Sequence, residues 1–170
     1  MKIRVVGQVW FREHSRFGDP VSFYEQPDSD FWQENNFITI RNSFQTDADC
    51  AVPVNGEHIL KLCFDDATTD PDGSLILFDE SIARRIAEFI KRIDTGRTLY
   101  INCAAGISRS GAVGEVLNDY FNRYREINEQ DFVYFRTYNR QICGNPLVRR
   151  ILREVLWEKD GSSVFSRGNL

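Results

Sequence analysis

Residues 98–111 read Thr98-Leu99-Tyr100-Ile101-Asn102-Cys103-Ala104-Ala105-Gly106-Ile107-Ser108-Arg109-Ser110-Gly111. The opening run at 98–101 is short and apolar, which is typical of a buried parallel strand. A helix is predicted over 110–122, because one helical face collects the apolar residues Val113, Val116, Leu117, Tyr120 and Phe121. The stretch therefore predicts a strand, a loop of small residues and a helix in succession.

The loop in this stretch has the composition of an anion site. Its small side chains and Gly106 allow several backbone N–H groups to converge on one point, and the following helix N-terminus adds partial positive charge. Such a nest stabilises the thiolate of a cysteine at its base, here Cys103, and Arg109 is able to hold two phosphate oxygens in its planar fork. The alternative is a buried structural cysteine with Arg109 in a salt bridge. The ten residues 102–111 together favour a nucleophile in a phosphate-binding loop.

The rest of the chain supplies further strands and helices. Strands are predicted at 2–11, 37–40 and 59–64, and helices at 31–35, at 79–94 and at 146–158. Strands and helices in this order indicate an α/β fold, with a central, mostly parallel sheet of four or five strands and helices on both faces. We expect one domain over residues 1–170, with 159–170 as a flexible tail.

Composition excludes several classes of protein. Of the 170 residues, 42% are hydrophobic and 27% are charged, and no run approaches the ~18 consecutive apolar residues of a membrane span. The net charge of −4 disfavours a general nucleic-acid binder, which is usually basic. Arginine outnumbers lysine 17 to 4, and arginine is better suited to bidentate recognition of phosphate or carboxylate. The N-terminus lacks the apolar block of a secretory signal, so we expect a cytoplasmic protein.

Metal-binding residue types are few and scattered along the chain. The cysteines form no C-x-x-C pair, and two histidines accompany them: Cys50, Cys63, Cys103, Cys143, His14 and His58. No zinc site follows from these spacings. We expect reduced thiols, no metal and no cofactor.

The segment 102–110 resembles the signature loop of the cysteine-dependent protein tyrosine phosphatases, and most closely that of their dual-specificity branch. The family pattern is His-Cys, five residues, Arg, then Ser or Thr; Cys103, Gly106, Arg109 and Ser110 match it. Asn102 departs from it, because the family usually has a histidine there that helps to orient the loop and to lower the thiol pKa. Residues 139–146 also resemble the Arg-Pro-x-Ile-x-Pro-Asn segment that opens the last helix in that branch, although two of its prolines are missing. The resemblance spans residues 37–158, and the first 36 residues match no pattern that we can name.

The resemblance implies a reaction and a role for each residue of the loop. Cys103 would be the nucleophile, Ser110 would assist its departure, and Arg109 would bind phosphate together with the loop amides, which belong to Ala104, Ala105, Gly106, Ile107, Ser108 and Arg109. A separate aspartic acid would protonate the leaving oxygen and then activate the water that hydrolyses phosphocysteine.

Four carboxylates are candidates for that acid. The strands at 59–64 and 98–102 flank a crossover helix, so they are expected to be parallel and to end at the same edge of the sheet. Asp65 and Asp66 follow the first of these strands, whereas Asp70 and Asp72 lie in the turn beyond. Alignment from the strand selects Asp66, and alignment by distance to the cysteine favours Asp70 or Asp72. We take Asp66 as the acid and keep the other three as alternatives.

Three further residues receive lesser roles. Asn145 is expected to brace the loop from the start of the last helix, and Arg41 to meet substrate at the end of its strand. Cys63 is expected to be packed in the core, with a reversible Cys63–Cys103 disulfide under oxidants as the alternative.

The variable loop positions indicate the substrate class. Ala104, Ala105, Ile107 and Ser108 are not basic, whereas phosphoinositide-specific members of the family often carry lysine there. Phosphotyrosine remains, with or without phosphoserine and phosphothreonine, so the expected partner is a phosphoprotein or phosphopeptide, without nucleic acid or membrane. The alternatives are a catalytically silent phosphate-binding module, a phosphatase for a non-protein ester, and a redox or sulfur-transfer protein. The sequence leaves the biological substrate and the oligomeric state open.

Overall fold

Four parallel strands form the centre of the structure. They are β1 (Ile3–Gly7), β2 (Asn36–Arg41), β3 (Ile59–Cys63) and β4 (Leu99–Cys103), in the spatial order β1-β4-β2-β3. β4 pairs with both β1 and β2, and β2 pairs with β3, in parallel register throughout. The predicted parallel α/β sheet is confirmed. Its strands all end at one edge, where Cys103 lies beside Gly7.

The chain is represented by a computed structural model that describes residues 1–14, 29–46, 49–52, 54–125 and 127–158. The tail predicted at 159–170 lies outside the described residues. Among the helices described, none combines the length and the apolarity that crossing a bilayer requires.

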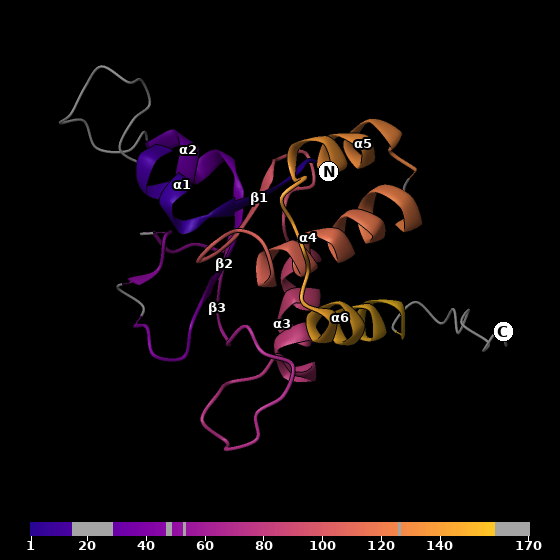
Figure 1. Cartoon of the computed structure of the whole chain (residues 1–170). Helices are drawn as coiled ribbons and strands as arrows, with labels where there is room; N and C mark the ends of the chain where they lie inside the picture. Colours follow the sequence, from indigo (N-terminus) through magenta and orange to yellow (C-terminus); the bar gives the residue numbers. More distant parts are fainter. Residues whose placement is uncertain (15–28, 47–48, 53, 126, 159–170) are drawn as a thin grey trace, which may run out of the picture.

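Helices cover both faces of the sheet (Figure 1). On one face lie α1 (Gln8–His14) and α2 (Ser29–Glu34), and on the other lie α3 (Glu80–Ile90), α4 (Arg109–Asp119), α5 (Glu129–Tyr138) and α6 (Pro146–Glu158). Successive strand residues alternate between the two cores, as the period of a strand requires. Val5 and Ile38 are buried with α3, α4 and α6, whereas their neighbours Val6 and Phe37 are buried with the aromatic residues of α1 and α2.

The prediction of one strand over 2–11 is wrong in its second half. β1 ends at Gly7, and the Gln8 amide donates to the Ala104 carbonyl (3.0 Å) as the chain turns into α1. Phe11 of this helix is fully buried, with its ring centroid 5.6 Å from that of Trp32 and 5.9 Å from that of Phe37. Val, Trp and Phe favour strands locally, but packing against the sheet decides the conformation here.

Most other predicted elements are confirmed. The α6 boundaries match the predicted helix at 146–158. The helix predicted at 79–94 is α3, and Asp79 caps it, because the Asp79 carboxylate accepts a hydrogen bond from the Ile82 amide (2.8 Å). The helix predicted at 110–122 is α-helical over Arg109–Asp119 and continues as a π-helical segment, η2 (Tyr120–Arg125). Helix α5 was not predicted, because Phe135 is its one buried residue and its apolar periodicity is weak.

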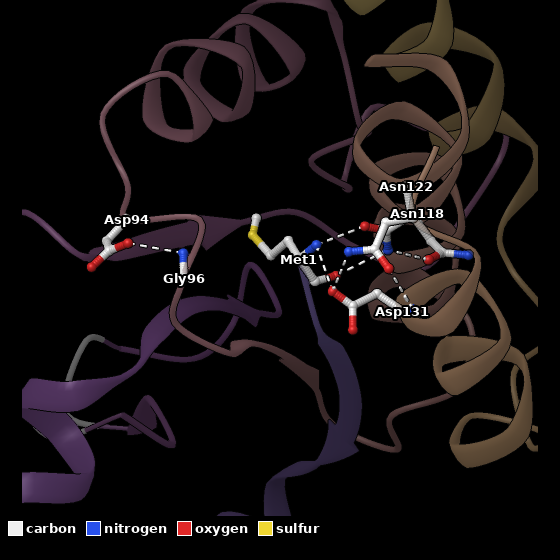
Figure 2. A network of polar contacts seen from close by, with 7 residues as sticks. Met1, Asp94, Gly96, Asn118, Asn122 and Asp131 are labelled. Carbon is white, nitrogen blue, oxygen red and sulfur yellow. Dashed lines mark hydrogen bonds and ion pairs between the residues drawn. The ribbon is translucent and has the colours of Figure 1, made fainter. Parts of the chain in front are cut away.

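The start of β1 is tied to the helices by a polar network (Figure 2). The Met1 amino group donates to Asn122 Oδ1 (2.7 Å) and pairs with the Asp131 carboxylate (2.8 Å). Asn122 Nδ2 lies 2.9 Å from the Met1 carbonyl and 2.7 Å from Asn118 Oδ1. Asn122 is 2% exposed, so these partners replace the water that it would otherwise bind. The network joins β1 to α4, η2 and α5.

Replacement of Asn122 tests this network. The Asn122→Ala change leaves the Met1 carbonyl and Asn118 Oδ1 without this donor, so the free energy of unfolding is expected to fall by about 1–3 kcal/mol. Urea unfolding followed by circular dichroism measures it. A matched change at a half-buried position is Asn35→Ala in the turn after α2, which removes a single hydrogen bond to the Phe31 carbonyl and is expected to cost less. Equal losses would contradict a special role for Asn122.

Candidate active site

The phosphate-loop candidate connects β4 to α4 and passes over the end of β1. Gly106 has φ of +72°, and a Cβ atom at this position would overlap the Gly7 nitrogen and the Val6 carbonyl carbon. A residue with a side chain would therefore need both a rare backbone conformation and a displaced β1. The loop curls inward because of this close approach, and the predicted nest has a structural basis at Gly106.

Cys103 lies at the base of this loop and is 2% exposed. Burial raises the pKa of its thiol, but hydrogen bonds from the Ser110 hydroxyl and from the Ser110 and Gly106 amides lower it, as does the charge of Arg109. The lowering effects prevail, so the pKa of Cys103 lies below its ordinary value. Cys103 Sγ and Ser110 Oγ are 3.1 Å apart. The lowered pKa favours the thiolate form of Cys103.

Arg109 starts α4 and is buried, with 4% exposure. Its Nη1 donates to the Phe64 carbonyl (2.7 Å) at the end of β3, which fixes the guanidinium across the site. Its Nε is also buried and has no hydrogen-bond partner among the described residues. A buried donor without a partner is costly, and an anion in the loop would satisfy it.

Asp66 lies against the same loop. Its Oδ1 accepts hydrogen bonds from Ser108 Oγ (2.7 Å) and from Asn145 Nδ2 (2.9 Å), and the residue is exposed. No contact to Oδ2 is seen among the described residues. One carboxylate oxygen is therefore held by the loop and by the start of α6, while the other is available to a ligand.

The other three acid candidates have structural partners. Asp65 is buried, and its two oxygens accept from the amides of Ser43 (3.0 Å) and Ile76 (2.9 Å). Burial raises the Asp65 pKa, but these donors and Arg109 outweigh it, so its pKa is below the ordinary value. The carboxylates of Asp70 and Asp72 bond to residues 74 and 75 within their own turn. Of the four candidates, Asp66 is the one that contacts the phosphate loop and Asn145.

Asn145 joins three segments that are far apart in the sequence. Its backbone amide donates to the Ser108 carbonyl (3.2 Å), its Nδ2 donates to Asp66, and its Oδ1 accepts from the Leu147 and Val148 amides at the start of α6. The expected bracing role thus has a geometric basis, and it extends to the acid candidate as well as to the loop.

The remaining candidates occupy the surroundings. Arg41 Nη1 donates to the Gln45 carbonyl and lies 3.0 Å from Cys63 Sγ, so this guanidinium supports the segment after β2. Cys63 and Cys103 are both free thiols. Asn102 is buried on β4 between β1 and β2, and its Oδ1 has no hydrogen-bond partner among the described residues.

Sequence reasoning missed the backbone and surface contributions to the site. The Phe64 carbonyl that orients Arg109 has no side-chain signal, and neither does the Gly7 backbone beneath Gly106. Ile107 and Phe44 are exposed, at 39% and 81%, and Phe44 follows the Ser43 amide that binds Asp65. Both apolar side chains therefore belong to segments at this edge of the sheet. No cluster of metal-ligating side chains is found in the described ranges.

The Ser110 hydroxyl is expected to control the ionisation of the thiol. In Ser110→Ala the thiolate loses one donor, so the pKa of Cys103 should rise and the thiolate should appear at higher pH. The ultraviolet absorbance of the thiolate, measured against pH as the difference from the same protein with Cys103→Ser, isolates this group. An unchanged midpoint would contradict the assignment.

No protein-family model matches the chain, and no curated protein matches it. The structure of Tk-PTP in the active form is similar, with a TM-score of 0.46 and 14% identity over 92% of each chain. The structure of PTPMT1 is similar with the same TM-score and identity, over 94% of this chain and 92% of that one. Both structures belong to the cysteine-dependent protein tyrosine phosphatase superfamily, whose signature loop residues 102–110 resemble.

Proposed function

We propose that this protein hydrolyses phosphate monoesters through a phosphocysteine intermediate. The observation that carries the proposal is the position of Cys103 at the base of a loop that turns at Gly106, which has a positive φ. The lowered pKa of Cys103 favours the thiolate, and Arg109 of the same loop has a buried Nε without a hydrogen-bond partner among the described residues. A buried thiolate and a buried free guanidinium donor in one nest suit a tetrahedral dianion.

In the first step the Cys103 thiolate attacks phosphorus, in line with the leaving oxygen. The S–P bond forms as the P–O bond breaks, and Arg109 and the loop amides stabilise the charge on the transferred phosphoryl oxygens. Asp66 donates its proton to the leaving oxygen, which departs as an alcohol or a phenol. Its contacts with Ser108 and Asn145 support this role, because they hold Asp66 at the loop while one oxygen remains available.

In the second step water attacks the phosphocysteine. Asp66, now a carboxylate, accepts a proton from the water, the S–P bond breaks, and inorganic phosphate leaves. Ser110 lies 3.1 Å from the sulfur and donates to it as the thiolate returns. No proton or electron is left over in this cycle, and no cofactor is required for its balance.

The proposed substrate is a phosphoprotein or phosphopeptide. The loop has no lysine or arginine before Arg109, so it offers no second cation to an inositol phosphate. The exposed rings and chains of Phe44 and Ile107 suit an aryl ester better than a highly charged sugar ester. Phosphotyrosine is therefore the preferred ester, and activity on phosphothreonine tests how broad the substrate specificity is.

A silent phosphate-binding module is the second candidate. The observation that favours it is Asn102, which stands where the family has histidine and leaves a buried oxygen without a partner. Such a module would bind phosphate in the loop and show no turnover.

Release of phosphate distinguishes these functions. Phosphotyrosine and phosphothreonine peptides are incubated with the wild type and with Cys103→Ser, with a metal chelator present. We expect release from phosphotyrosine by the wild type and none by Cys103→Ser. Phosphate binding without release from peptides or small esters would favour the module, and release by Cys103→Ser would contradict the nucleophile.

The acid is tested with leaving groups of different basicity. Asp66→Asn is expected to slow hydrolysis of an alkyl phosphate by about 100-fold or more, and that of a nitrophenyl phosphate much less, because a good leaving group needs no proton. Asp70→Asn and Asp72→Asn are matched controls in the neighbouring turn and are expected to behave as the wild type. The same leaving-group dependence in either control would contradict Asp66 as the general acid and assign that role to the aspartate replaced in that control.

A further inference from the structure

A groove of about 700 Å³ lies between α5 and α6, with α4 at its base. In Figure 1 these three helices lie together on one face of the sheet. The groove surface includes the apolar side chains of Phe132, Phe135, Ile142 and Pro146. The groove is thus partly apolar, and no residue of the loop between β4 and α4 lines it.

Arginine dominates the charge of this groove. Five arginines line it, against two carboxylates: Arg136, Arg140, Arg149, Arg150 and Arg153 against Glu115 and Asp119. The chain as a whole has a net charge of −4, so the groove is a local reversal of the protein's charge. A concave surface of one sign attracts ligands of the opposite sign.

The α6 wall is partly neutralised. Arg149 pairs with Glu115, and Arg153 pairs with Asp119, so both carboxylates of the groove are engaged by α6. Arg150 has its own partner, Glu154, at 3.4 Å. These pairs hold the α6 arginines in place along the groove.

The opposite wall, which α5 and the segment directly after it form, keeps its charge. Arg136 and Arg140 are exposed, and neither contacts a carboxylate within the part of the chain that the structure describes. The cations therefore stand on both walls, with apolar side chains between them. A compact polyphosphate is best held by cations around one point, whereas this arrangement suits an extended chain that carries acidic and apolar side chains.

One end of the groove adjoins the phosphate loop. The segment between α5 and α6 bonds to that loop, through Cys143 N to the Ile107 carbonyl (3.1 Å) and Asn145 N to the Ser108 carbonyl (3.2 Å). Ile142 of this segment and Pro146, the first residue of α6, line the groove. A polypeptide lying in the groove would therefore pass close to the loop that holds Cys103.

We propose that this groove docks an acidic segment of the phosphoprotein substrate, with its carboxylates against Arg136 and Arg140 and an apolar side chain at the groove base. The docked segment raises the effective concentration of the phosphorylated residue at Cys103. The identity of the segment as part of a substrate rests on the proposed function, whereas its binding does not require turnover.

Binding is measured first, on the Cys103→Ser protein, so that it does not depend on catalysis. The probe is a fluorescein-labelled peptide of alternating Asp or Glu and Phe or Leu, without phosphate, followed by fluorescence anisotropy at low salt. We expect the Arg136→Glu/Arg140→Glu pair to lower affinity about 10-fold or more, and added salt to weaken wild-type binding. The charge-matched control is Arg84→Glu/Arg92→Glu, with Arg84 on α3 and Arg92 just after it, which should keep the wild-type affinity. Circular dichroism checks that all variants fold.

Two further probes identify the occupant. The same peptide with its Phe and Leu replaced by Ser is expected to bind at least about 10-fold more weakly, because the apolar base is then unfilled. Equal affinities of the two peptides, or equal affinities of wild type and Arg136→Glu/Arg140→Glu, would overturn the proposal. Stronger binding of inositol hexakisphosphate or of a short RNA at this groove would also overturn it.

Turnover is measured second, on the active protein. With the acidic peptide joined to a phosphotyrosine, Arg136→Glu/Arg140→Glu should raise KM about 10-fold, and Arg84→Glu/Arg92→Glu should leave it unchanged. Peptide binding without hydrolysis of any ester would contradict the proposed phosphatase activity and leave the proposal of a peptide-binding groove in place. Hydrolysis with the same KM in both double variants would contradict substrate docking in the groove and leave the proposed phosphatase activity in place.

Discussion

The close passage of the loop between β4 and α4 over the end of β1 is the constraint on which the candidate site depends. Gly106 adopts a positive φ directly above the Val6–Gly7 backbone, where no side chain fits. The same approach ends β1 and lets the Gln8 amide bond to the loop at Ala104. The inward curl of the loop brings the amides of Gly106 and Ser110 to Cys103, and these donors help to offset the cost of burying a thiolate.

A second set of contacts links the loop to distant parts of the chain. Asp66 follows β3, Ser108 precedes α4 and Asn145 precedes α6, yet the three side chains are joined by hydrogen bonds. Asp66 is therefore held in part by Asn145 at the start of α6, the helix that also forms one wall of the groove between α5 and α6. The proposed chemistry and the proposed docking thus depend on one element, α6, whose start is capped by Asn145.

Local features of the fold were accessible from the sequence, and features made by distant contacts were less so. Cys103, Arg109 and Ser110 stand in one short stretch, so their pattern is visible without a structure. Asp66 was taken as the acid from its place after a predicted strand, but its contacts with Ser108 and Asn145 are not visible in any spacing along the chain. The second half of the predicted strand 2–11 is helical, as α1, because aromatic packing outweighs the local strand preference. Helix α5 is weakly amphipathic, so neither this helix nor the groove that it borders was predicted from the sequence.

The central claim is that Cys103 forms a covalent bond to phosphorus during turnover. Rapid alkaline quench of the wild type with an aryl phosphate, followed by mass spectrometry at neutral or alkaline pH of the peptide that contains Cys103, measures this bond directly. A phosphocysteine mechanism predicts one phosphoryl group on Cys103, formed within the first turnover and lost when substrate is exhausted. Turnover without any phosphoryl group on the protein, or with one on another residue, would contradict it.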